Sequence, residues 1–316
     1  MSVSKIVVRR YGNEPPRLVR KLRRASSVAP KPDDNSDPDL EAEYKRQVEE
    51  SDGFDVDECP YLDGGIFPYV LKDKYDYPFE TGLFGRLGLH CYNLDKGTNL
   101  KLIGVNQHHT EMTGVFVNYI TLEAMDTCNN FPCNFQTCVA RDIVAENASL
   151  KVETQLSRLK VPTGRPRATH VGFERRWENE AVDAFYKGKL PSWSAQDKLA
   201  GDKGQLHELQ PSDLQENEWL HLYAEFAFHL KWTGYGKGLK AFLPLKFNKV
   251  TIQTHESGEE SPNLIRARNA IFYMSFKGNG DPSGMSVEYR AIVRRTMDGM
   301  PGHIRLEVDC LAYKSS

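Results

Sequence analysis

The sequence predicts an α+β fold in which a helix packs on an antiparallel sheet and a second β-rich antiparallel region follows. Apolar residues recur at helical spacing between residues 84 and 94, and segments with the period-two alternation of strands begin soon after them. The last third of the chain is divided into short β-type segments by glycine-containing turns. A helix that leads directly into paired strands is the expected start of a sheet wrapped over a helix.

The composition is that of an ordinary water-soluble protein. Its 316 residues suffice for one large or two small domains, with 40% hydrophobic and 27% charged residues. No apolar run reaches the ~18 residues of a membrane span, and the N-terminus lacks the apolar core of a secretory signal. The cysteines are therefore expected to stay reduced in a cytosolic or nuclear compartment: Cys59, Cys91, Cys128, Cys133, Cys138 and Cys310.

The N-terminal tail, residues 1–39, is expected to be disordered because it is rich in proline and poor in large apolar residues. Its first 24 residues are basic, whereas residues 33–58 are mostly acidic. A basic cluster predicts nuclear import, and an organelle transit peptide is the alternative interpretation of the same tail. The cluster consists of Arg20, Lys21, Arg23 and Arg24.

Helix and strand signals are clearest in the first half. A short helix is expected over residues 40–51, and the main helix is expected to begin near Pro78 and to stop at Gly97. Three glycines lower its helix propensity but permit a close approach to a sheet: Gly82, Gly85 and Gly88. Strands are expected at residues 100–107, 115–124, 135–141 and 150–159.

The second half begins with a mostly irregular connection, residues 161–204, with a short helix expected near residues 178–185. This connection either separates two lobes or links two parts of one sheet. Residues 220–232 alternate with a period of two, which favours a strand, and a helix is the alternative. Further strands are expected at residues 247–255, 269–277, 287–296 and 303–310.

Residues 84–124 resemble the plant cystatin scaffold. FGRLGLHCYN is similar to the signature helix of that family, and NYITLEA matches the strand that follows its inhibitory hairpin. The resemblance implies a cystatin-like domain. The predicted parts are the tail 1–39, a short helix and linker 40–60, the cystatin-like domain 61–160, the connection 161–204 and a β-rich C-terminal domain 205–316.

The same resemblance implies a degenerate inhibitory wedge. Cystatins use an N-terminal glycine, a QxVxG hairpin and a Pro-Trp pair. Here a glutamate replaces the glutamine, the hairpin glycine falls one place early, and no Pro-Trp follows the third strand. A carboxylate is costly to bury in a narrow cleft, so inhibition of papain-like cysteine proteases is the alternative function. The wedge positions are Gly64, Gly65, Glu111, Met112, Thr113, Gly114 and Val115.

Four longer segments resemble an uncharacterised crucifer-plant family grouped with Male Sterile Five and Embryo Defective proteins and described as cystatin/monellin-like. They are QVEESDGFDVD (47–57), NEWLHLYAEFA (217–227), NAIFYMSFKG (269–278) and YRAIVRRTMDGMPGHIRLEVDC (289–310). The resemblance implies a plant-specific, non-enzymatic interaction protein in reproductive development, in male fertility, meiosis or embryo development. Its protein partner is unknown, and an exposed sheet edge offers one way to accept a partner strand.

Metal, thiol, phosphate and nucleic-acid chemistry find little support, so no catalytic, cofactor-binding or metal residue is assigned. Cys128, Cys133 and Cys138 are spaced by five, whereas zinc sites use closer pairs, and Cys133 and Cys138 should point to opposite faces of a regular strand.

The pairs Cys91 with His90 and Cys310 with His303 lack a catalytic signature. The glycine-rich residues 234–238 lack the spacing of a phosphate loop, and no basic concentration beyond residue 58 favours nucleic acid.

Overall fold

The computed structural model describes residues 37–61, 64–112, 114–144, 149–160, 177–193, 206–232, 236–255, 264–280 and 287–314. In chain order the elements are α1 (Pro38–Ser51), β1 (Ile66–Tyr69), α2 (Phe79–Lys96), β2 (Leu100–Met112), β3 (Phe116–Asp126), β4 (Phe131–Val144), β5 (Ser149–Leu159), η1 (Asn179–Ala181), η2 (Ala184–Tyr186), β6 (Leu206–Glu208), α4 (Pro211–Glu216), α5 (Leu220–Lys231), η3 (Gly236–Phe242), β7 (Lys246–Gln253), β8 (Ala270–Lys277), β9 (Val287–Thr296) and β10 (Arg305–Lys314). The predicted disordered tail and its basic cluster fall almost entirely outside the described residues.

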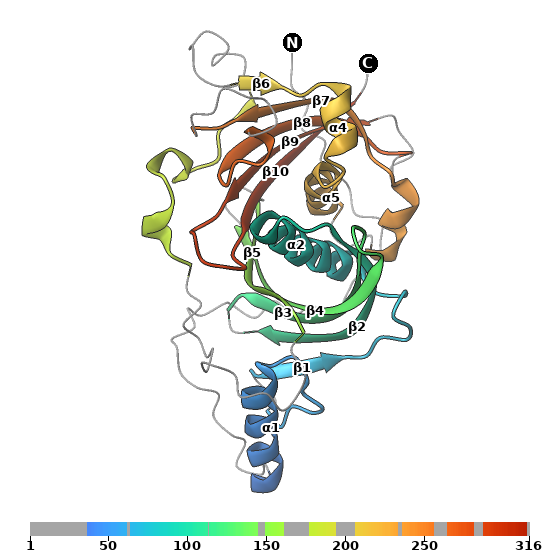
Figure 1. Ribbon diagram of the computed structural model, residues 1–316, viewed down its shortest axis with the longest axis vertical. Helices are drawn as coiled ribbons and strands as arrows, with labels where there is room; N and C mark the ends of the chain where they lie inside the picture. The colour runs from blue at the N-terminus through green and yellow to red at the C-terminus, as the bar shows by residue number, and fades with distance from the viewer. Residues whose placement is uncertain are drawn as a thin grey trace.

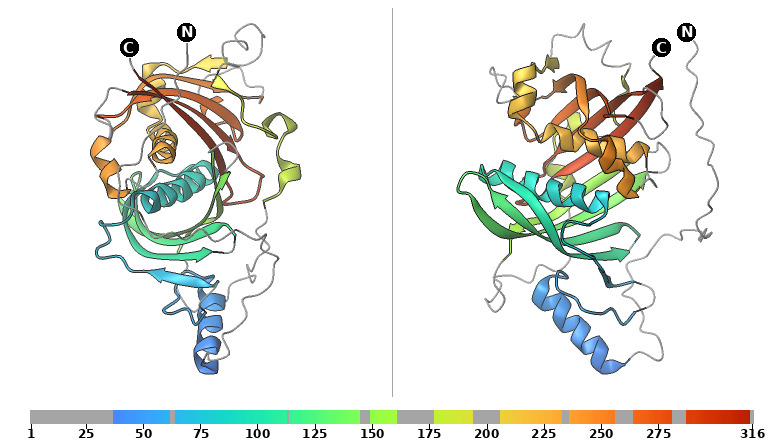
Figure 2. Two further views of the ribbon diagram at one scale, coloured as in Figure 1. Left: turned by 180° about the vertical axis from the view of Figure 1, so that it is seen from behind. Right: turned by 90° about the vertical axis from the view of Figure 1, so that its right-hand side faces the viewer.

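The strands form one antiparallel sheet of ten strands in the order β1-β2-β3-β4-β5-β10-β9-β8-β7-β6. Because β5 pairs with β10, the second β-rich region continues the sheet of the first. Both long central helices, α2 and α5, lie inside the curve of this sheet, whereas α1 projects away beyond β1 (Figure 1). Two further views show the same arrangement (Figure 2). The predicted α+β fold, with a helix on an antiparallel sheet, is confirmed.

Helix α2 docks closely on the sheet because two of its glycines face it. A Cβ atom at Gly85 would lie 3.0 Å from Leu122, and one at Gly88 would lie 2.2 Å from the hydroxyl of Thr137. The helix ends at Gly97, whose φ of 65° is in the left-handed region. The expected close packing and the expected stop are both confirmed.

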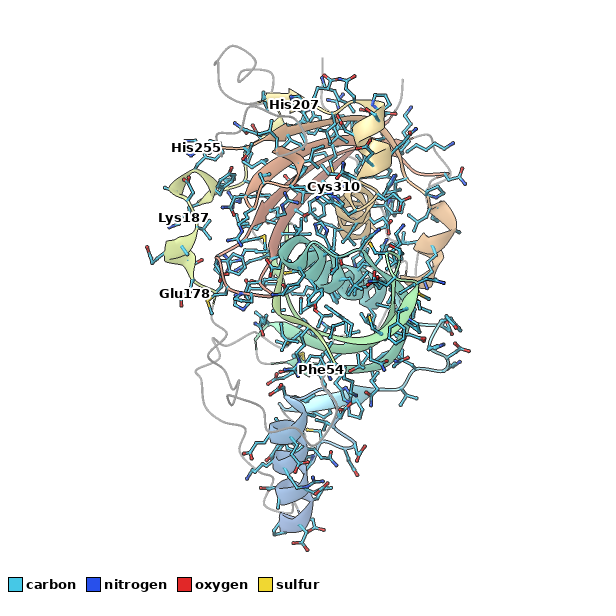
Figure 3. The ribbon with its side chains drawn as sticks, in the orientation of Figure 1. Phe54, Glu178, Lys187, His207, His255 and Cys310 are labelled. Carbon is cyan, nitrogen blue, oxygen red and sulfur yellow. The ribbon has the colours of Figure 1, made fainter. Side chains whose placement is uncertain are left out.

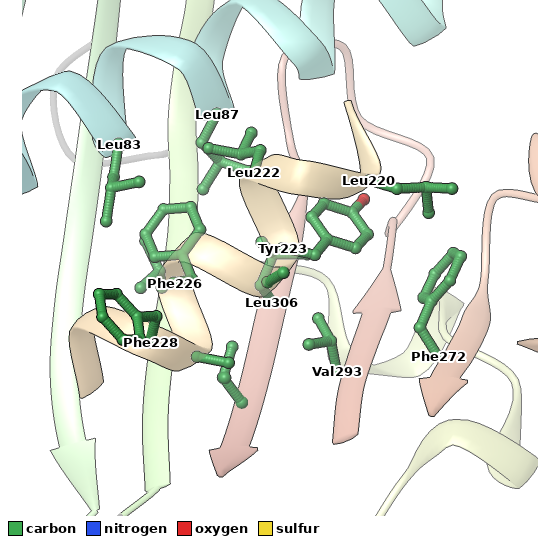
Figure 4. Packing of buried hydrophobic residues seen from close by; sticks show 14 of the residues in the cluster. Leu83, Leu87, Leu220, Leu222, Tyr223, Phe226, Phe228, Phe272, Val293 and Leu306 are labelled. Atoms are coloured by element: carbon green, nitrogen blue, oxygen red, sulfur yellow. The ribbon is translucent and has the colours of Figure 1, made fainter. Parts of the chain in front are cut away.

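The prediction of a strand over residues 220–232 is wrong, because α5 is an α-helix. Its side chains are buried on nearly every side by α2, β9 and β10, so an apolar stripe with a helical period is lost. Figure 4 shows Leu220, Tyr223 and Phe226 of this helix pointing in different directions, each into the core. The alternation in the sequence therefore reflects a helix that is buried on nearly all sides, and it does not indicate a strand.

The short helix expected near residues 178–185 is replaced by two 3₁₀ turns, η1 and η2. Val182 between them is extended, and the Asp183 carboxylate accepts a hydrogen bond from the N–H of Phe185 at 2.8 Å. This local bond competes with continuation of a helix.

Two segments cover the convex face of the sheet, each beside its own half. Phe54 and Val56 lie against the first half, and Val182 and Tyr186 lie against the second. Figure 3 shows the two regions, with Phe54 near β1 and Glu178 and Lys187 on the outer side of the second half. The protein therefore has a core on each face of one sheet, with α2 and α5 on the concave side.

Candidate protein-interaction surface

The structure brings the predicted wedge positions together at one end of the first half. Ile66 of β1 lies opposite Glu111 of β2, so Gly64 and Gly65 lie beside the β2–β3 hairpin that carries Met112 and Gly114. Gly114 has a φ of 91°, which favours glycine in this turn. Thr113 lies outside the described residues.

Gly65 is buried under the segment that precedes it. A Cβ atom at Gly65 would lie 2.6 Å from the sulfur of Cys59 and 3.1 Å from the hydroxyl of Tyr44. The same hydroxyl accepts a hydrogen bond from the N–H of Ile66 at 2.8 Å. Helix α1 and the residues after it therefore cover Gly65, which is not free to enter a protease cleft.

Glu111 points to the convex face and is bound there. The hydroxyl of Tyr119 donates a hydrogen bond to the Glu111 carboxylate at 2.7 Å, and burial raises the pKa of Tyr119 far above its usual value. Burial also raises the pKa of Tyr44 to about 12. Val115 packs nearby on the cluster around Phe54. These contacts give Glu111 and Val115 structural roles in holding the hairpin.

The concave side of the same end exposes four large apolar side chains, named here the hairpin patch. Its members are Phe67, Tyr69, Met112 and Phe116, which are 36%, 46%, 63% and 52% exposed. Met112 and Phe116 are direct cross-strand partners, and Phe67 lies opposite the residue two places before Met112. Because side chains alternate along a strand, all four share the face that carries the core residue Ile120. The first half therefore presents four exposed apolar side chains on one face of three neighbouring strands, with Thr110 opposite Phe67.

A partly buried ionic network lies beside Phe116 of this patch, because Arg141 is the cross-strand partner of Phe116. The guanidinium of Arg141 lies 5.8 Å from the Phe116 ring and 2.6 Å from the Glu80 carboxylate, and His229 lies 3.3 Å from the same carboxylate. Burial opposes ionisation of Glu80, but the hydrogen bond from His229 and the charge of Arg141 outweigh it and lower its pKa. The network links α2, β4 and α5 next to the patch.

The outer edge of β1 is poorly suited to strand addition. The N–H of Ile66 is bound to the Tyr44 hydroxyl, and Pro68, two residues later on the same edge, has no N–H. An incoming strand needs such outward donors. At this edge recognition must therefore use side chains.

The thiols give no arrangement that favours metal or nucleophilic chemistry. All six cysteines lie in the described ranges and none forms a disulfide, and no group of three or more His, Cys, Asp or Glu residues could hold a metal within those ranges. Cys133 packs on the concave core and Cys138 on the convex one, as expected from their spacing.

The two Cys–His pairs that lack a catalytic signature in the sequence have histidines engaged in structural contacts. His90 is hydrogen-bonded to Tyr223 at 3.0 Å, and His303 to Asp298 at 2.9 Å. Burial raises the pKa values of Cys91 and Cys310 to about 12. These thiols are therefore poor nucleophiles near neutral pH.

Other sequence-based candidates contribute nothing here. Arg20, Lys21, Arg23 and Arg24 lie outside the described residues, as does part of the glycine-rich segment at residues 234–238. None of the described helices is both long enough and apolar enough to cross a membrane. Sequence reasoning found the hairpin but missed Phe67, Tyr69, Phe116 and Arg141, since nothing in their spacing shows that this end of the sheet is left uncovered.

Comparisons with known proteins agree on one plant family. A family model described as Protein MS5 matches residues 190–306. The chain is 52% identical over 283 residues to UPF0725 protein At4g28920 of Arabidopsis thaliana, and the aligned region covers 86% of this chain and 90% of the relative. It is 39% identical over 282 residues to UPF0725 protein At4g29550 of the same plant, with 88% of this chain and 76% of the relative covered. The crystal structure of MS5 from Brassica napus matches with a TM-score of 0.55 and 25% identity, covering 75% of this chain and 100% of that one.

Proposed function

Because the chain belongs to the MS5 family of plant proteins, named UPF0725, we propose that it is a non-enzymatic protein-interaction module that binds a protein partner through the hairpin patch. The resemblance to Male Sterile Five and Embryo Defective proteins supports a place in plant reproductive development. The reduced cysteines support the cytosol or the nucleus as its compartment.

One observation carries this proposal: four large apolar side chains are exposed together on one face, beside the Arg141–Glu80 ion pair. Aromatic residues and methionine are enriched in the centres of protein interfaces, and a contiguous exposed apolar area marks an interaction site. The side chains of Met112 and Phe116 are more than half exposed, and burying their apolar surface against a partner would be favourable. A partner that covers the patch removes this area from water without rearranging the sheet.

Inhibition of papain-like cysteine proteases is the second candidate, because Gly64, Gly65 and the hairpin do lie side by side. The cover over Gly65 and the carboxylate of Glu111 count against it. Titration of a papain-like protease with the purified protein separates the candidates. We expect no loss of protease activity, and stoichiometric inhibition would favour the second candidate.

The proposal is tested by affinity purification of the tagged protein from flower buds, followed by mass spectrometry. Three forms are compared: the natural protein, Phe116→Glu and Phe131→Glu. Phe131 is 67% exposed and lies opposite Asp126 at the far end of the β3–β4 pair, so it controls for the loss of an exposed phenylalanine. We expect a partner that is retained by Phe131→Glu and lost with Phe116→Glu. Identical partners for all three forms would refute a role for the patch.

A further inference from the structure

The two halves of the sheet have the same plan. Each half has a segment on the convex face, a short edge strand, a helix on the concave face and then four antiparallel strands (Figure 2). In the first half these are residues 44–61, β1, α2 and β2–β5, and in the second they are residues 177–193, β6, α5 and β7–β10. The short helix α4 is an addition to the second half.

The strand registers of the two halves coincide over the β3–β4 pair, where residues 116–122 match residues 270–276 of the β8–β9 pair. When the pair Phe116–Arg141 is matched to Ala270–Arg295, Val139 falls on Val293 without a gap. The same match places Tyr119 on Tyr273. The Tyr119 hydroxyl donates to Glu111 at 2.7 Å, and the Tyr273 hydroxyl donates to Gln253 at 3.1 Å.

The seam between the halves is symmetric in the same register. Val152 of β5 lies opposite Leu306 of β10, and these two residues correspond to each other under the match. On one side of them Glu153 faces Arg305, with 2.8 Å between carboxylate and guanidinium, and on the other Lys151 faces Glu307. An acidic and a basic residue thus pair on each side of a local two-fold axis. The chain has the architecture of a duplicated unit.

The halves differ where the hairpin patch lies. In the first half the second and third strands are joined by residues 113–115, and in the second half by residues 254–269. Part of the longer connection folds back over its own half: Ile265 and Ala267 are 2% and 5% exposed. Their carbonyls accept hydrogen bonds from Arg295, at 2.9 Å for Ile265. Arg295, the counterpart of Arg141, is thereby fully buried.

From this internal comparison, and resting on the function proposed above, we infer that the hairpin patch accepts a short apolar peptide segment of a partner protein. The segment presents an aliphatic side chain to Phe116 and Met112, as Ile265 joins the concave core of the second half beside Arg295. Its backbone carbonyls accept hydrogen bonds from Arg141. A carbonyl suits this position because Glu80 already neutralises Arg141, while a guanidinium carries five N–H donors.

The test uses a synthetic peptide with blocked ends and the sequence of residues 262–269, Pro-Asn-Leu-Ile-Arg-Ala-Arg-Asn. It is labelled and titrated with the full-length protein while fluorescence anisotropy is measured. We expect saturable binding that weakens at least about tenfold with Phe116→Glu and with a peptide carrying Ile265→Asp. Phe131→Glu should bind like the natural protein, and Arg141→Met should bind several-fold more weakly. Thermal melting of each variant verifies that it is folded.

Two results overturn the inference: no saturable binding of the peptide, or equal binding by the natural protein and Phe116→Glu. If the peptide fails while Phe116→Glu still loses its partner from flower buds, the proposed function stands and only the partner chemistry is wrong. If both experiments fail, the patch is not a binding site.

Discussion

Gly88→Ala should destabilise the protein by about 2 kcal/mol, although alanine is the better helix former. The added Cβ would lie 2.2 Å from the Thr137 hydroxyl and 2.4 Å from its Cβ. The second atom is fixed to the backbone of β4, so a change of rotamer cannot relieve the contact. Helix α2 or the strand must move instead.

The magnitude follows from two opposing effects. Inserting a methyl group into a packed site costs about 1–3 kcal/mol, and three atoms of Thr137 closer than 3.0 Å place Gly88 at the upper end. Replacing glycine by alanine inside a helix returns up to about 1 kcal/mol. Gly85→Ala is the matched control on the same helix face. It meets only the end of the Leu122 side chain, at 3.0 Å, so its net effect should be near zero.

Urea unfolding followed by circular dichroism measures both variants against the natural protein. The expected order of unfolding free energies is natural protein and Gly85→Ala together, with Gly88→Ala about 2 kcal/mol lower. If Gly88→Ala were as stable as Gly85→Ala, the close docking of α2 on β4 would be refuted.

Three further outcomes are expected. Burial and the charge of Arg295 lower the pKa of His90 in the folded state, so the unfolded state binds more protons below about pH 6.5 and stability falls as pH drops. Urea unfolding from about pH 7 to about pH 5 should show this fall, and His90→Asn should make it shallower. Tyr44→Phe leaves the outward N–H of Ile66 unbound and should cost about 1 kcal/mol in the same assay, with more self-association in sedimentation runs. Arg86→Ala leaves the Glu225 carboxylate, which is 8% exposed, without its partner and should lower the free energy of unfolding by about 2 kcal/mol. Glu225→Gln should lower it less, because the remaining Arg86 side chain can reach water. Equal losses for these last two variants would contradict the burial of Glu225.

The first half of the fold could be predicted closely from its sequence because its signals are local. Gly97 stops α2, and the residues of β5 alternate between buried and partly exposed positions. The second half lacked such a signal at α5, where neighbours on all sides require apolar residues at almost every position. Residues 178–185 were predicted as a helix because helix propensity takes no account of the hydrogen bond from the N–H of Phe185 to the Asp183 carboxylate.

The candidate site was only partly accessible to sequence reasoning. Glu111 and the hairpin could be located from their distance to the following strand. The exposure of Phe116 depends on the short connection between β2 and β3. In the second half the corresponding connection is longer, and it covers Arg295, the counterpart of Arg141. Tyr69 and Phe67 flank a proline in a strand of four residues, a pattern that gives little indication of a strand.

The structure distinguishes between two ways for this end of the sheet to recognise a partner. Addition of a strand needs free outward N–H groups on β1, but Ile66 gives its N–H to Tyr44 and Pro68 has none. Apolar side chains, in contrast, stand exposed on the concave face beside the Arg141–Glu80 pair. An edge that cannot pair with other strands lets the protein keep an apolar patch in water with less risk of aggregation. Partner recognition through side chains therefore follows from the same contacts that close the edge.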